Sequence, residues 1–396
     1  MHMETQREEN AFLREMSREL EALRTGGSFR QLREIAHGAG AQASWEGRAY
    51  RNFSSNDYMG VGGNLAWRQA FYAQYPDASS PELAQSCTSS RLLTGNTPAY
   101  RRLEETLSRL YGGRAALVFN SGYHANIGIL PALSSKEDLI LSDKLNHASI
   151  IDGMRLCAAP FRRYRHNDME HLRQLLRQLR GGCRRLFLVT ESVFSMDGDC
   201  APLAELVALK EEFDAILVVD EAHGVGVRGP GGRGLAAELG LAERVDVLVG
   251  TFGKAFGSTG AYAIMDPVVR EYLVNHARSL IFTTGLPPVV LNWSDFVLRH
   301  FSELEGERLA LLEKARRLRE LFRGRGLSTG GDSQIVPLMV GEDREACRLA
   351  EAYQGAGILV FPIRHPTVPL GTARLRFSLS AALSREDVEL AGGFRP

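Results

Sequence analysis

The chain has 396 residues, which is longer than one hydrophobic core usually holds, so two linked domains are expected. With 44% hydrophobic residues, the apolar material for their cores is ample. The 47 Lys and Arg residues balance 47 Asp and Glu residues, which argues against nucleic acid or an anionic membrane as a partner. Five scattered cysteines form no C-x-x-C pair and favour neither a disulfide framework nor a zinc site, and no metal site is predicted.

The N-terminal segment, residues 1–50, is predicted to be a helical arm. Its first twenty residues are too charged for a signal peptide, and no apolar run in the chain approaches eighteen residues, so a cytoplasmic protein is expected. Apolar residues at positions 12, 13, 16, 20 and 23 share one helical face. That face is expected to pack on the protein's own core or on a partner subunit.

A large α/β domain is predicted over residues 51–287. The helical pattern AYRRLEETLSRLYGG ends at a glycine pair, and short apolar runs then alternate with helix-like stretches: AALVFN, DLILSD, RLFLVTE, AILVVDE and VDVLVG. Runs rich in Val, Leu and Ile are typical of strands buried on both faces of a largely parallel sheet.

A smaller α+β domain is predicted over residues 288–396. Pro287 and Pro288 interrupt the chain, and a long helical stretch follows from Trp293 to Arg323. The segments QIVPLMV, ILVFPI and RLRFSLS then have the composition of strands. A large central domain with a smaller C-terminal one is the simplest division.

Polar residues follow the predicted strands, at the positions where open α/β sheets bind ligands. Asp220 and His223 follow AILVV, Thr251 and Lys254 follow VDVLVG, and Ser195 comes shortly after RLFLVTE. A single His or Ser at a strand end is usually an ordinary loop residue. Their joint occurrence in chain order is what indicates a site.

The glycines in HGVGVRG fit the G-x-G-x-x-G spacing of dinucleotide-binding proteins. Polar or small residues separate them from the strand, and the continuation PGGRG cannot open the helix that this motif requires. A nucleotide-binding fold is therefore rejected.

Lys254 differs from the other four lysines. Lys210 and Lys314 lie in amphipathic helical stretches and Lys136 and Lys144 in polar loops, where a solvated charge is the simpler interpretation. Only Lys254 follows a buried strand inside a glycine-rich loop, GTFGKAFGSTG, where desolvation lowers the pKa of an amine. A lysine with a lowered pKa is suited to forming a Schiff base.

The neighbours of Lys254 suit pyridoxal 5'-phosphate. Asp220 can keep the pyridine nitrogen protonated, so that the ring is an electron sink, and His223 can reach the phenolic oxygen. His147, in KLNHASI, is placed to lie flat over the ring. The predicted phosphate donors are Ser195, Thr251 and backbone amides near Gly122 and Tyr123 in FNSGYHAN.

With these residues the chain resembles the α-oxoamine synthases, a branch of the fold-type I (aspartate aminotransferase-like) pyridoxal-phosphate enzymes. The likeness runs from about residue 27 to residue 382, through NFSSNDYMG, FNSGYHANIG, NHASIIDG, HNDMEHL, ESVFSMDGDCAPL, VDEAHGVGVRGPGGRG, GTFGKAFGSTG and PTVPLGTARLRFSLSA. The resemblance implies a large domain with a mostly parallel seven-stranded sheet, a smaller C-terminal α+β domain, and a homodimer with active sites at its interface.

The resemblance also implies roles for individual residues. Lys254 would hold the cofactor covalently and shuttle protons, Asp220 would contact the ring nitrogen, and His223 the phenolic oxygen. His147 would stack on the ring and touch the acyl substrate, and Arg376 would clamp the amino-acid carboxylate with its planar fork. The further implied contacts are Ser195, Thr251, Gly122 and Tyr123 with the cofactor, Thr283 and Thr284 with its phosphate from the partner chain, Arg30 and Thr367 with the acyl substrate, and Asn56 with the bound amino acid.

The implied reaction is the decarboxylative condensation of L-alanine with a pimeloyl thioester of coenzyme A or of an acyl carrier protein, as in biotin biosynthesis. The segment PTVPLGTARLRFSLSA favours it over four alternatives with the same catalytic residues: glycine C-acetyltransferase, 5-aminolevulinate synthase, serine palmitoyltransferase and autoinducer synthase. The loop SCTSSRLLTGNTPAY departs from the more glycine-rich form of some members and leaves the acyl preference open. A catalytically silent partner subunit is another alternative, against which the intact Asp220, His223 and Lys254 argue.

The arginines of PFRRYRH, residues 160–166, are interpreted as a solvated face, with contact to a carrier's phosphates as the alternative.

Overall fold

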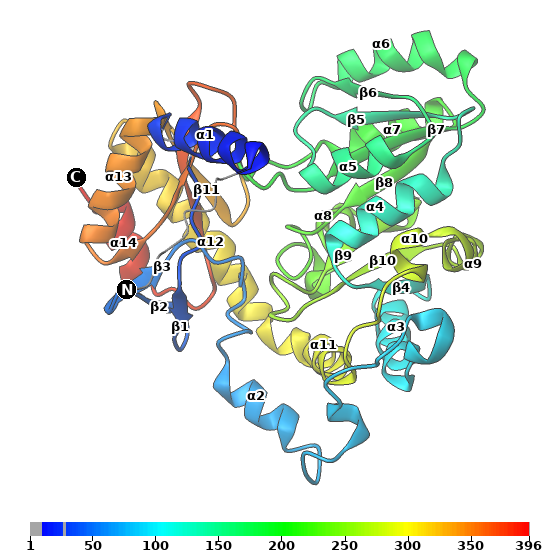
Figure 1. Cartoon of the computed structure of the whole chain (residues 1–396), viewed down its shortest axis with the longest axis horizontal. Helices are drawn as coiled ribbons and strands as arrows, with labels where there is room; N and C mark the ends of the chain where they lie inside the picture. Colours follow the sequence, from blue (N-terminus) through cyan, green and yellow to red (C-terminus); the bar gives the residue numbers. More distant parts are fainter. Residues whose placement is uncertain (1–9, 27–28, 396) are drawn as a thin grey trace.

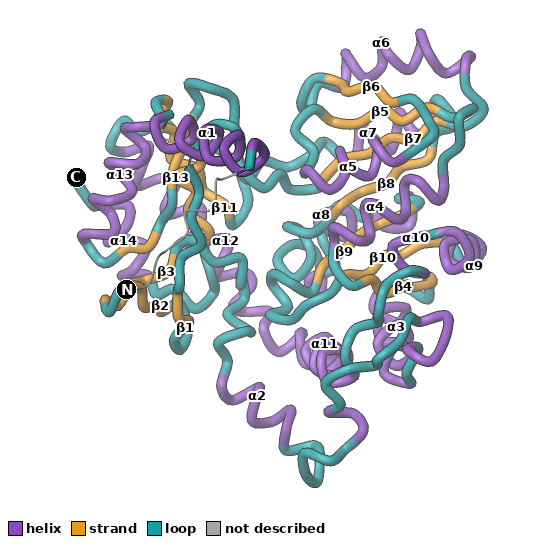
Figure 2. Tube along the Cα trace, viewed as in Figure 1, coloured by secondary structure: helices purple, strands orange, loops and turns teal. Residues whose placement is uncertain are grey.

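The computed structural model describes residues 10–26 and 29–395, so the first nine residues and residues 27–28 of the predicted arm lie outside the described chain. Figure 1 shows two lobes, and Figure 2 shows that each contains its own group of strands. Within the described residues, no helix combines the length and apolar character that a bilayer span requires.

The large lobe is built on a seven-stranded sheet. Its strand order is β4 (Ala115–Phe119), β10 (Ala261–Met265), β9 (Val247–Thr251), β8 (Ile216–Asp220), β7 (Leu186–Glu191), β5 (Leu139–Asp143) and β6 (Phe161–Tyr164). Strand β10 runs antiparallel to both neighbours, and all other adjacent pairs are parallel. Every residue of β5, β7, β9 and β10 is buried, as in a sheet covered on both faces. The prediction of a mostly parallel seven-stranded sheet is confirmed.

Helices cover both faces of this sheet. One face packs on α4 (Gly122–Leu133), α5 (Ala148–Leu156), α9 (Pro267–His276) and α10 (Arg278–Ile281). The other face packs on α3 (Pro98–Leu110), α6 (Met169–Leu179), α7 (Leu203–Glu212), α8 (Leu235–Glu238) and α11 (Pro288–His300). The alternation of side chains along β4 separates the two layers, because Leu117 faces the first and Val118 the second.

The small lobe contains an antiparallel sheet of β11 (Ile335–Gly341), β14 (Ala373–Ser378) and β13 (Pro362–Ile363), with helices α12 (Glu305–Gly324), α13 (Asp343–Gly355) and α14 (Arg385–Gly393). The prediction of one strand over ILVFPI is wrong. This segment forms two short strands in different sheets, because β12 (Ile358–Leu359) pairs with the N-terminal strand β3 (Arg48–Asn52) and β13 pairs with β14. The chain crosses from one sheet to the other between them.

The N-terminal arm is helical only in part, which corrects the prediction for residues 1–50. Helix α1 (Ala11–Thr25) is followed by β1 (Ile35–His37), β2 (Gln42–Trp45) and β3, and the three strands join β12 in a four-stranded sheet of the small lobe. The β2–β3 hairpin turns at Glu46 and Gly47, which both have positive φ angles, as a tight two-residue turn requires. No described side chain of α1 is buried, and Phe12, Leu13, Leu20 and Leu23 on its apolar face are 42–65% exposed.

The predicted helix from Trp293 to Arg323 is two helices, α11 and α12, separated by a turn at Phe301–Leu304. The break directs Phe301 into the protein, where its ring centroid lies 4.7 Å from that of Phe256. Helix α11 packs on α3 in the large lobe, whereas α12 leads into the small lobe (Figure 1). The domain boundary at residue 287 stays a prediction.

Candidate active site

The loop after β9 presents Lys254 at an open cavity of about 500 Å³. The Thr251 hydroxyl donates to the Gly260 carbonyl (3.0 Å) and accepts the Gly253 N–H (3.1 Å), which folds the loop back on itself. A Cβ at Gly257, where φ is 52°, would lie 2.4 Å from the Gly62 nitrogen. Only glycine therefore allows the loop this close to the segment that forms the opposite wall.

The Lys254 amine lies 2.8 Å from His223 Nε2. Desolvation lowers the pKa of Lys254 to about 8, against the opposing charges of Asp220 and Glu191. The sequence predicted this direction from the buried strand and the glycine-rich loop. The uncharged amine is therefore far more accessible near neutral pH than in an ordinary lysine.

Asp220 ends β8 as a buried carboxylate with both oxygens hydrogen-bonded. Oδ2 accepts from the Asn126 side chain (2.8 Å) and Oδ1 from the Ala222 N–H (2.9 Å). These donors stabilise a carboxylate charge that burial alone would oppose. Asn126, on α4, was not singled out from the sequence, although it lies in the quoted segment FNSGYHAN.

His147 caps the N-terminus of α5. Its backbone N–H donates to Glu191 Oε1 (2.5 Å), and its Nδ1 lies 2.8 Å from the Ser149 hydroxyl. Burial lowers the pKa of His147, although the charge of Asp220 raises it, and the ring is neutral near pH 7. Burial also raises the pKa of Glu191 well above its usual value, and the Asp220 charge adds to this shift. Glu191 thus orients the residue predicted to face the ring by accepting the His147 backbone N–H.

A polar network joins His223 to the residues predicted to bind substrate. His223 Nδ1 lies 2.6 Å from the Tyr58 hydroxyl, and Arg376 donates to that hydroxyl (3.3 Å) and to Asn56 Oδ1 (3.2 Å). Arg376 Nε also donates to the Ser195 carbonyl. Burial, followed by the charges of Lys254 and Arg376, lowers the pKa of His223 well below its usual value. Tyr58 was missed, although it stands two residues after Asn56.

The N-terminus of α4 faces open space. Ser121 caps it by accepting the His124 N–H (3.2 Å), and a Cβ added to Gly122 would meet no atom within 4 Å. The first-turn amides of Gly122 and Tyr123 have no acceptor within the helix, which is the geometry that binds phosphate. The Tyr123 side chain itself turns away and donates to Asp152 (2.8 Å).

Thr283 and Thr284 lie beside the same helix terminus of their own chain. Asn120 donates to the Thr283 hydroxyl (3.2 Å) and to the Thr284 carbonyl (2.7 Å). Arg30 and Thr367 contact each other (3.1 Å) at a separate cavity of about 240 Å³. Neither of these two residues lines the cavity at Lys254.

The G-x-G-x-x-G segment does not lead into a long helix, because the next α-helix, α8, has four residues. Its glycines instead permit close packing. A Cβ at Gly226 would lie 2.4 Å from the Cβ of Ala255, next to Lys254. The rejection of a nucleotide motif agrees with this geometry.

Comparison with known proteins decides the family. The sequence profile described as aminotransferase class I and II matches residues 49–391. The chain belongs to this family, in its α-oxoamine synthase branch. It is 51% identical over 375 residues to the 8-amino-7-oxononanoate synthase of Chlorobaculum parvum, a match that covers 94% of this chain and 96% of the relative.

Solved structures agree with this family. A serine palmitoyltransferase from S. paucimobilis with bound PLP and myriocin superposes with a TM-score of 0.88 at 30% identity, over 97% of each chain. The 8-amino-7-oxononanoate synthase of Francisella tularensis superposes with a TM-score of 0.71 at 30% identity, over 86% of this chain and 95% of that one. The predicted fold-type I architecture is thereby confirmed.

Proposed function

We propose that the protein is a pyridoxal-phosphate-dependent acyltransferase that condenses L-alanine with a pimeloyl thioester, forming 8-amino-7-oxononanoate, carbon dioxide and a free thiol. The observation that carries this proposal is the Lys254 amine, whose pKa is lowered to about 8 beside Asp220 and His223 at the open cavity. The 51% identity to a relative named 8-amino-7-oxononanoate synthase supports this substrate pair over the family alternatives.

The chemistry of the donor set fits pyridoxal 5'-phosphate. Lys254 would bind the aldehyde, the Asp220 carboxylate the pyridine nitrogen, and His223 the phenolic oxygen. The open amides of Gly122 and Tyr123, with Ser195 and Thr251, are the proposed surroundings of the phosphate within one chain, and Thr283 and Thr284 of the partner chain are proposed to complete them. When bound, the cofactor supplies an electrophilic carbon and a ring that delocalises negative charge from the substrate Cα.

Different residues of the chain bind the substrates and move the proton. Arg376 binds the alanine carboxylate with two parallel donors, and Asn56 holds that guanidinium in place. The Lys254 amine, once free, removes the Cα proton, for which a pKa near the working pH is suited. His147 polarises the thioester carbonyl as a neutral donor.

Each bond that forms in the proposed condensation is matched by one that breaks. The alanine Cα–H bond breaks and its proton goes to Lys254; a bond from Cα to the acyl carbon forms, and the carbon–sulfur bond breaks to release a thiolate, which takes a proton from solvent to become the free thiol. The former alanine carboxylate then leaves as carbon dioxide, and a proton returns to Cα. Glu191, by fixing the His147 backbone, keeps that ring in place through both carbon–carbon steps.

The functional unit is proposed to be a homodimer in which Thr284 of one chain completes the phosphate site of the other. The surface beside Thr284 supports this, because Leu92, Leu93 and Phe282 are 50%, 77% and 70% exposed. Apolar groups gathered in this way are typical of a protein interface. Light scattering should give twice the chain mass, and Leu93→Asp should lower it. The acyl carrier, coenzyme A or a carrier protein, contributes the other substrate.

Two measurements test the function. Borohydride treatment of the holoprotein should leave a pyridoxyl label on the peptide that contains Lys254, and Lys254→Ala should lose the label while Lys210→Ala, a control on helix α7, retains it. Release of free thiol should be fastest with L-alanine and pimeloyl thioesters. Faster release with glycine or serine and another acyl group would reassign the enzyme within its family, and a colourless protein that gains no absorbance with added cofactor would indicate a silent subunit.

A further inference from the structure

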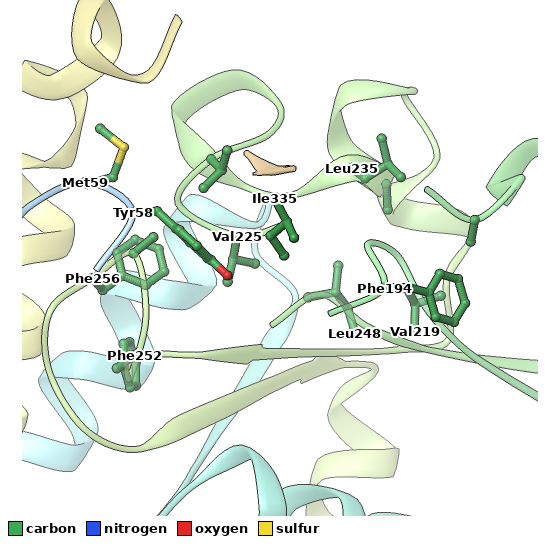
Figure 3. Close-up of a cluster of buried hydrophobic side chains, with 14 of the residues drawn as sticks. Tyr58, Met59, Phe194, Val219, Val225, Leu235, Leu248, Phe252, Phe256 and Ile335 are labelled. Carbon is green, nitrogen blue, oxygen red and sulfur yellow. The ribbon is translucent and has the colours of Figure 1, made fainter. Parts of the chain in front are cut away.

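Tyr58 is fully buried, and the hydroxyl is the only polar group of its side chain. Figure 3 shows its ring among Val225, Phe252 and Phe256, with the hydroxyl at the far end. Burial raises the pKa of Tyr58, so the phenol keeps its proton. A buried phenol needs a partner for that proton.

The surrounding groups decide where the phenol proton points. Arg376 can only donate, so its contact with the Tyr58 oxygen (3.3 Å) uses a lone pair. Asn56 Oδ1 lies 3.1 Å from the hydroxyl but already accepts from both terminal nitrogens of Arg376, each at 3.2 Å. His223 Nδ1, at 2.6 Å, is the nearest acceptor with a free lone pair. The phenol therefore donates to His223 Nδ1.

This contact determines the tautomer of His223. The ring is neutral because burial and the charges of Lys254 and Arg376 lower the pKa of His223 far below its usual value. Its single proton must then reside on Nε2, which faces the Lys254 amine at 2.8 Å. An Nε2–H can donate only to an uncharged amine, because an ammonium has no lone pair. Gln334 fixes the position of the His223 backbone by donating to the His223 carbonyl (2.8 Å).

We propose that Tyr58 is a positioning residue that fixes His223 as the Nε2–H tautomer, so that His223 donates into the site and favours the uncharged form of Lys254. The inference rests on the proposed function, because it assigns Lys254 the task of capturing the cofactor. Tyr58 would act through His223 alone, without touching either substrate or cofactor.

The test is the rate at which apoenzyme captures pyridoxal 5'-phosphate as a function of pH, followed by the visible absorbance of the bound cofactor. Only the uncharged amine reacts, so the rate rises through the pKa of Lys254. Tyr58→Phe removes the phenol proton and should move the midpoint upward by about 1 pH unit, the equivalent of one buried hydrogen bond. Replacing Tyr58 by 3-fluorotyrosine, a more acidic donor of nearly the same shape, should move it downward and also serves if the Phe variant does not fold.

Two controls separate this role from a general effect of removing a buried hydroxyl. Tyr353→Phe deletes a buried hydroxyl that contacts the Ala391 carbonyl and Arg325, both in the small lobe, and it should leave the midpoint unchanged. In a His223→Ala background, Tyr58→Phe should have no further effect. The inference is overturned if both Tyr58 variants keep the wild-type midpoint, or if the shift persists without His223. A wild-type apoenzyme that captures no cofactor at any pH would instead contradict the proposed function.

Discussion

His166 should contribute to stability as a cation held between two carboxylates. It follows β6, where its Nδ1 lies 2.9 Å from Asp143 Oδ1 and its Nε2 lies 2.7 Å from Asp199 Oδ2. Carboxylates only accept hydrogen bonds, so both ring nitrogens carry protons. Burial lowers the pKa of His166, but the bonds to Asp143 and Asp199 outweigh it and raise the pKa to about 10.

The size of the effect follows from this shift. A rise from 6.5 to about 10 corresponds to about 5 kcal/mol as an upper bound. The His166 side chain is 25% exposed, so solvent screening reduces this stabilisation energy. Two charge-assisted hydrogen bonds, after subtraction of the cost of desolvating the charged groups, suggest a contribution of about 3 kcal/mol. Because folding raises the pKa of His166, its contribution to the free energy of unfolding is complete below about pH 6.5 and is lost as the pH rises through about 10.

The assay is scanning calorimetry of the wild type and of His166→Gln at matched concentration and several pH values. The variant should melt about 3 °C lower near pH 7, since a chain of this length loses roughly 1 °C per kcal/mol, and the difference should shrink towards pH 10. His276→Gln, an exposed site in the large lobe, should show no such trend. A wild-type advantage of constant size from pH 7 to pH 10 would refute a charged His166.

Three further outcomes are expected. Arg376→Lys should raise the KM for L-alanine about 10-fold to 100-fold with a smaller change in kcat, because a lysine cannot donate in parallel to a carboxylate; steady-state kinetics would show it. Asp220→Asn should lower kcat about 100-fold while the protein still captures cofactor, which separates the charge from the shape of this group. Gly198→Ala should destabilise the protein by about 3 kcal/mol or more, because a Cβ there, at φ 67°, would lie 2.2 Å from the Ile335 carbonyl oxygen. Gly181→Ala, where a Cβ meets nothing within 4 Å, is its calorimetric control.

The large lobe was predictable because its strands are buried on both faces. Runs such as RLFLVTE and VDVLVG have no polar alternation, and they became β7 and β9 with every residue buried. The N-terminal strands were missed because β1 to β3 are short and largely exposed, and their residues are as often polar as apolar. Their partner β12 lies about 300 residues further along the chain, and sequence periodicity carries no information on such a pairing.

The site was predictable where it follows the ends of parallel strands. Lys254, His223 and Asp220 follow adjacent strands β9 and β8, so the strand-end rule places them together. Tyr58 follows β3, which belongs to the other lobe's sheet, and its place beside His223 depends on how the lobes pack. His166 was interpreted within a solvated basic face, because nothing in PFRRYRH indicates that Asp143 and Asp199 converge on it.

The same packing connects the chemistry of the amine to the binding of the substrate. Arg376 stands on β14 in the small lobe, and Lys254 stands on the loop after β9 in the large lobe. Between them, Tyr58 accepts from Arg376 and donates to His223, which in turn reaches Lys254. A displacement of the small lobe would therefore move Arg376 away from the substrate carboxylate and, at the same time, break the chain of hydrogen bonds that leads to Lys254. Hydrogen bonds weaken steeply with distance and angle, so the Lys254 amine is reactive only when the lobes are packed correctly. Variants that loosen the contact between the lobes are therefore expected to lose substrate binding and amine activation together.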